Sequence, residues 1–114
     1  MTPEGRVKQD IEELLLDYGF IKAGMKGGQW PSPVTGWYYM PVQTGYGVNG
    51  LPDFICQWQP IGFFGIETKA PGKLNNLSPN QERRHAEIRA AGATVVVVDS
   101  VEMLDQFMWD QLLC

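Results

Sequence analysis

Two apolar segments, 53–59 (DFICQWQ) and 62–69 (GFFGIETK), follow each other closely in the chain and are joined by the short turn PIG. Both are rich in aromatic and branched residues that favour strands, and so short a connection is typical of a hairpin. In an antiparallel hairpin, the start of one strand lies beside the end of the next. The sequence therefore predicts that Asp53 lies close to Glu67 and Lys69 at one rim of a sheet.

The rest of the chain predicts an α/β fold with a mixed sheet flanked by helices. Apolar periodicity and capping residues indicate helices over 4–18, 79–91 and 101–112. Further strands are expected over 37–42 and 93–100, with the second buried on both faces. Residues 22–36 read as a loop, and 43–52 form a glycine-rich approach to Asp53. A helix between the last two strands implies a parallel crossover after the antiparallel hairpin.

Length and composition limit the class of protein. A chain of 114 residues suits one domain, here 1–114, and its segments are too short and its N-terminus too polar for a membrane span or a signal peptide. Two distant cysteines, Cys56 and Cys114, give no zinc spacing and fit a reducing, cytoplasmic setting. A net charge of −4 argues against nucleic-acid binding, unless carboxylates hold divalent metal ions that neutralise them.

The predicted rim suggests metal chemistry. Two carboxylates held close together repel, and a divalent cation such as Mg²⁺ or Mn²⁺ resolves that conflict. The backbone carbonyl of Thr68 would add a ligand, while Lys69 would orient or deprotonate a water or stabilise charge on a phosphate. This set indicates metal-assisted phosphodiester hydrolysis. The alternative is a surface ion-pair cluster, which is disfavoured because Glu67 ends an apolar run.

Several other residues have more than one possible role. Lys73 and Lys26 are candidate phosphate contacts or solvated charges. Glu4, on the inward stripe of the first helix, has a simple explanation in the helix dipole. His85 is expected to pack or to line the edge of the site. The aromatic residues either belong to the core or stack on bases: Trp30, Trp37, Tyr38 and Tyr39.

The chain resembles the VRR-NUC family of the PD-(D/E)XK nuclease superfamily. The resemblance is carried by GVNGLPD, by IETKAPGKLNNLSPNQ and by AAGATVVVVDSVEML, and it covers about residues 4–108. It implies a restriction-endonuclease-like αβββαβ(α) core. By resemblance, Asp53 and Glu67 are metal-binding acids with the Thr68 carbonyl, Lys69 is the catalytic lysine, and Gln81 supports the site.

Two of the residues that match family positions also have another explanation. Glu4 matches the first-helix acid of the family, which is an outer metal ligand or holds a water. Gln81 lies three residues after Ser78, the spacing of a capping box, and the two roles are expected to need different orientations of its side chain.

We therefore expect a Mg²⁺-dependent DNA endonuclease, with Mn²⁺ as a substitute. The resemblance implies a phage or bacterial protein of replication or repair that cleaves branched DNA such as four-way junctions as a homodimer. The apolar tail FMWDQLLC would suit a dimer interface. The alternatives are a non-catalytic nucleic-acid or protein-binding module that keeps the fold and, less favoured, a restriction-type nuclease that reads a short DNA sequence.

Overall fold

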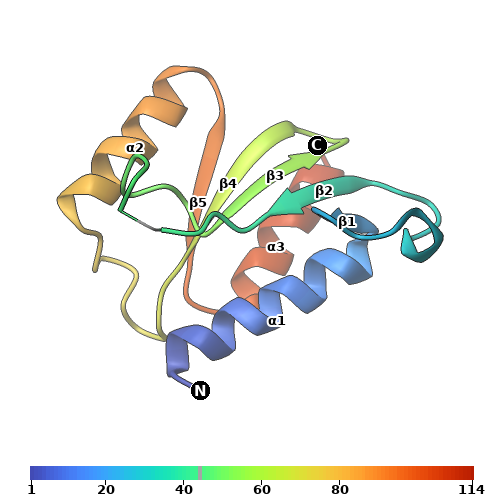
Figure 1. The fold of residues 1–114 in the computed structure, drawn as a ribbon, viewed down its shortest axis with the longest axis horizontal. Helices are drawn as coiled ribbons and strands as arrows, with labels where there is room; N and C mark the ends of the chain where they lie inside the picture. The colour runs from blue at the N-terminus through green and yellow to red at the C-terminus, as the bar shows by residue number, and fades with distance from the viewer. Residues whose placement is uncertain (44) are drawn as a thin grey trace.

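A computed structural model describes residues 1–43 and 45–114; Thr44, part of the predicted approach to Asp53, lies outside the described residues. These residues form one five-stranded sheet in the order β1-β2-β3-β4-β5, with helices on either side of it (Figure 1). The strands are β1 (Phe20–Lys22), β2 (Gly36–Tyr39), β3 (Phe54–Trp58), β4 (Gly62–Thr68) and β5 (Thr94–Val98). The helices are α1 (Pro3–Tyr18), the short 3-10 helix η1 (Gly27–Gln29), α2 (Pro79–Ala90) and α3 (Val101–Leu112). None of the described helices is long and apolar enough to cross a membrane.

The predicted hairpin and crossover are both confirmed. β3 and β4 are antiparallel, with Phe54 opposite Ile66 and Trp58 opposite Gly62. β4 and β5 are parallel and are connected through α2, while β2 pairs antiparallel with β3. The sheet is therefore mixed, as the element order predicted.

The strand β1 was not predicted, because its three residues are too few to show a period. It pairs parallel with β2 at the edge of the sheet, with Phe20 opposite Gly36. Phe20 is fully buried, and a β-carbon on Gly36 would lie 2.9 Å from its ring. Tertiary packing and a glycine on the neighbouring strand thus place this segment in the sheet.

The hydrophobic core lies between one face of the sheet and the helices α1 and α3 (Figure 1). α1 contributes Val7, Ile11 and Leu15, and α3 contributes Leu104 and Met108. The opposite face carries α2, which packs against β5. The expectation that the last strand is buried on both faces is only partly met: Val95 and Val98 are buried, but Val96 and Val97 are half-buried because β5 is an edge strand.

Candidate active site

The end of the hairpin brings Asp53 against β4. Asp53 directly precedes β3, and extending the register by one pair sets it opposite Glu67. The backbone N–H and the hydroxyl of Thr68 donate to Asp53 Oδ2, at 2.8 and 2.7 Å. Glu67, Thr68 and Lys69 are all buried. The rim predicted from sequence therefore exists, and the Thr68 side chain belongs to it as well as its backbone.

Helix α2 binds both carboxylate oxygens of Glu67. Gln81 Nε2 donates to Glu67 Oε2 at 3.3 Å, and His85 Nε2 lies 3.1 Å from Glu67 Oε1. The two α2 residues are four positions apart, so they lie on one face of the helix. His85 is fully buried, and its Nδ1 has no hydrogen-bond partner among the described residues. The expectation of a packing or edge position for His85 understated its contact with Glu67.

One orientation of the Gln81 side chain serves both of its expected roles, so the prediction that they exclude each other was wrong. Its Oε1 accepts from the backbone N–H of Ser78 and from Lys69 Nζ, each at 3.0 Å. Its Nε2 remains free to donate to Glu67. The sequence argument overlooked that the amide oxygen accepts two hydrogen bonds while the nitrogen donates separately. The capping box therefore fixes the residue that links Lys69 to Glu67.

A glycine sets the distance between the approach to Asp53 and the start of α2. Gly50 has φ +89°, and a β-carbon there would lie 2.4 Å from the backbone of Asn80. Gly50 thus packs directly against the first turn of α2, which carries Gln81. Two residues further along the same segment, Pro52 packs against β4 and occupies the space that a side chain on Gly65 would need.

The two carboxyl groups have opposite pKa shifts. Burial and the charge of Asp53 raise the pKa of Glu67 to about 9, with a smaller contribution from Glu4. Burial opposes ionisation of Asp53, but hydrogen bonds with Thr68 and Glu67, and the charge of Lys8, outweigh it and lower the pKa of Asp53. Near neutral pH the pair therefore retains one proton between its two carboxyl groups.

Helix α1 brings two more charged residues to this rim. Lys8 Nζ lies 3.4 Å from Asp53 Oδ1. Glu4, in the first turn of α1 and half-buried, is close enough for its charge to act on Glu67. Sequence analysis identified Glu4 but missed Lys8; the available signal was its position one helical turn after Glu4, on the same side of the helix.

The donor set fits a small divalent cation. No cluster of three or more His, Cys, Asp or Glu side chains arranged to hold a metal occurs within residues 1–43 and 45–114. Mg²⁺ nevertheless needs only one or two carboxylates, because it retains several waters and also binds substrate phosphates. Asp53 and Glu67 provide two, and a cation would replace the proton that they now share.

Comparison with known proteins identifies the fold. No family model matches the sequence, and no curated protein matches it. A solved structure of a VRR_NUC domain aligns over 95% of this chain and 96% of its own, with a TM-score of 0.62 and 27% sequence identity. The chain has the VRR-NUC fold. The resemblance seen in the sequence is confirmed, and the architecture is that of a nuclease family.

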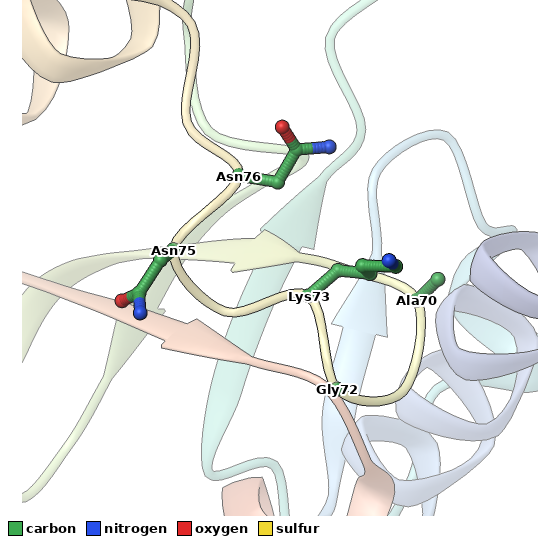
Figure 2. A pocket seen from close by; sticks show the side chains of 5 residues that line it. All are labelled: Ala70, Gly72, Lys73, Asn75 and Asn76. Carbon is green, nitrogen blue, oxygen red and sulfur yellow. The ribbon is translucent and has the colours of Figure 1, made fainter.

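In this VRR-NUC fold, the two candidate phosphate contacts lie in different places. Lys73 lines a pocket of about 620 Å³ with Ala70, Gly72, Asn75 and Asn76. Figure 2 shows that these residues all come from the loop between β4 and α2, which directly follows Lys69. Lys26 precedes η1, which lies at the opposite end of the molecule from α2 in Figure 1. Lys73 therefore lies in the loop that directly follows Lys69 (Figure 2), whereas Lys26 lies at the far end of the molecule (Figure 1).

The aromatic residues divide between the core and the surface. Tyr38 is fully buried, and its hydroxyl donates to Glu12. Trp37 and Tyr39 point to the other face of the sheet, where they stack on each other and remain exposed; Trp30 is exposed as well. The prediction that these aromatic residues belong to the core is confirmed for Tyr38 only.

Proposed function

We propose that this chain is a metal-dependent nuclease that hydrolyses phosphodiester bonds. The observation that supports it most is the convergence of Asp53, Glu67 and Lys69 at one rim. A surface ion-pair cluster would leave these groups in water, whereas Glu67 is 2% exposed and Lys69 is 6% exposed. Burying such groups is costly, and a site that uses them justifies that cost better than stability does.

The residues would divide the work as follows. Asp53 and Glu67, with the backbone carbonyl of Thr68, would hold Mg²⁺, or Mn²⁺ in its place, and Glu4 would hold a water or act as an outer ligand. When bound, the cation supplies a Lewis acid for the phosphodiester and lowers the pKa of a bound water. Lys69, held by Gln81, would orient the attacking water or stabilise charge on the phosphate. Lys73 would contact a neighbouring phosphate.

The finer assignment is an endodeoxyribonuclease specific for branched DNA. We propose that residues 1–114 act as one nuclease domain in the cytoplasm, in replication or repair, and that two copies form a homodimer. A single chain offers one site, whereas symmetric cleavage of two strands requires two sites. Lys26 would contact DNA only beyond the immediate neighbourhood of the site.

The test is cleavage of labelled four-way junction, flap, single-stranded and linear duplex DNA. Wild type and Lys69→Ala are compared with Mg²⁺, Mn²⁺ or EDTA, and Lys22→Ala serves as a control because Lys22 pairs with Glu12 outside the site. We expect metal-dependent cutting of the junction that Lys69→Ala loses and Lys22→Ala keeps.

Other outcomes would assign the chain elsewhere. Binding of DNA without cutting, in every metal, would favour a non-catalytic module that retains the nuclease fold. Cutting of linear duplex at a fixed sequence would favour a restriction-type specificity. Equal cutting by wild type and Lys69→Ala would reject the role of the lysine.

A further inference from the structure

Asp53 has different partners on its two oxygens. Oδ2 accepts two hydrogen bonds, from the backbone N–H and from the hydroxyl of Thr68, and these hold the carboxylate in place. Oδ1 faces the Lys8 ammonium at 3.4 Å. Oδ1 is therefore the oxygen of Asp53 that a cation reaches without displacing a hydrogen bond from Thr68, and the lysine already provides positive charge there.

Lys8 differs from Lys69 in how firmly it is held. Lys69 is buried directly after β4 and donates to Gln81 of α2, so both elements hold it in position. The Lys8 side chain is 35% exposed and comes from a separate element, α1. A lysine side chain is flexible, so moving its ammonium group into water costs little free energy. Lys8 can therefore leave Asp53 when a stronger cation arrives.

We propose that Lys8 is a built-in counter-cation of the site, which competes with a divalent metal ion for Asp53 and so sets the metal concentration at which the site fills. The inference rests on the proposed function, because it assumes that Asp53 is a metal ligand. Lys8 acts here through Asp53 and is a positioning residue, not a catalytic one.

The rival explanation is an ordinary ion pair that fastens α1 to the sheet. The two explanations predict opposite changes in metal affinity when the charge of Lys8 is removed. Removing a fastening loosens the site and weakens metal binding, whereas removing a competitor frees Asp53 and strengthens it. Pairs with this degree of exposure are worth up to about 1 kcal/mol, so we expect metal binding to tighten by about threefold to fivefold.

The experiment is calorimetric titration of the full chain with MnCl₂ in the absence of DNA, so the readout does not depend on cleavage. The variants are Lys8→Gln, which removes the charge, and Lys8→Arg, which keeps it. Lys22→Gln is the matched control, since it removes one positive charge from another ion pair, 2.6 Å from Glu12. Asp53→Asn removes the ligand. Thermal melts in EDTA verify that every variant folds.

We expect Lys8→Gln to bind Mn²⁺ more tightly than wild type, while Lys22→Gln and Lys8→Arg bind like wild type. Binding by Lys8→Gln that is unchanged or weaker overturns the competition, and if Asp53→Asn still abolishes binding, the proposed metal site survives. Equal tightening in Lys8→Gln and Lys22→Gln also overturns it, because overall charge would then be the cause. No Mn²⁺ binding by wild type would reject both proposals together.

Discussion

Gln81 uses one amide group for three hydrogen bonds, to Ser78, Lys69 and Glu67. Its oxygen satisfies a backbone N–H at the start of α2 and also fixes the Lys69 ammonium. Local helix capping and site geometry are therefore coupled through one side chain. Mutations of Ser78 and of Gln81 can therefore distinguish a loss of helix capping from a loss of site geometry.

We predict that Gln81→Ala and Ser78→Ala have similar effects on stability and different effects on nuclease activity. Both lose part of the capping box, at a cost of about 1 kcal/mol. Ser78→Ala keeps the contacts of Gln81 with Lys69 and Glu67, so its cleavage rate should stay near that of wild type. Gln81→Ala releases Lys69, and a rate about a hundredfold lower is expected. Urea unfolding and junction cleavage measure the two effects; equal rates for the two variants would contradict the role of Gln81.

The raised pKa of Glu67 leads us to predict that the stability of the metal-free protein depends on pH. Its pKa is about 9 in the fold against a usual value of 4.5, so between these values the folded chain binds the extra proton. The stabilisation is complete below pH 4.5 and is lost as the pH rises through about 9. Glu67→Gln does not titrate, so its unfolding free energy in EDTA should fall less over this interval. Glu13→Gln, at an exposed position on α1, is the control and should follow wild type.

Helix α2 is an element whose attachment depends on the site. Among its twelve residues, His85 alone is fully buried, and it contacts Glu67. Most of α2 is polar and faces water, so hydrophobic burial provides little of its docking. The close approach of Gly50 to Asn80 then fixes where the helix begins.

We predict that Gly50→Ala impairs both stability and cleavage. Gly50 has φ +89°, and its β-carbon would overlap the Asn80 backbone at 2.4 Å, so α2 must shift with Gln81. Gly24→Ala is the matched control, because Gly24 has φ +88° and open space around it. The control should lose about 1 kcal/mol from backbone strain alone, and Gly50→Ala about 3 kcal/mol. Melting and junction cleavage test this; equal losses would mean that the contact with α2 is unimportant.

Elements with a strong period were predictable, and contacts between elements were not. The hairpin and the three long helices follow from apolar spacing and caps, and the register then brings Asp53 to Glu67. β1 was missed because three residues carry no period and its place depends on Gly36. The helical spacing places Lys8 on the same side of α1 as Glu4, but its contact with Asp53 depends on how α1 packs against the sheet, which the spacing alone does not determine.

Burial within α3 requires a revision of the predicted dimer interface. Met108 is fully buried and Phe107 packs against the core, so neither is available to a partner. The exposed apolar residues of this tail are Trp109, Leu112 and Leu113. An interface on α3 would therefore use the outer side of the helix and its C-terminal end.

We predict that exposed residues of this α3 surface hold the proposed homodimer together. Trp109→Asp with Leu113→Asp should produce a monomer that melts near the wild-type temperature, because both side chains lie outside the core. Val42→Asp, at an apolar position that is 75% exposed and outside α3, is the control and should stay dimeric. Analytical ultracentrifugation at micromolar concentrations measures the association. The monomeric variant should nick one strand of a junction more often than it cuts both, since paired cleavage requires two sites. A wild-type chain that sediments as a monomer would reject the dimer, and a dimer that survives both substitutions would move the interface to another surface.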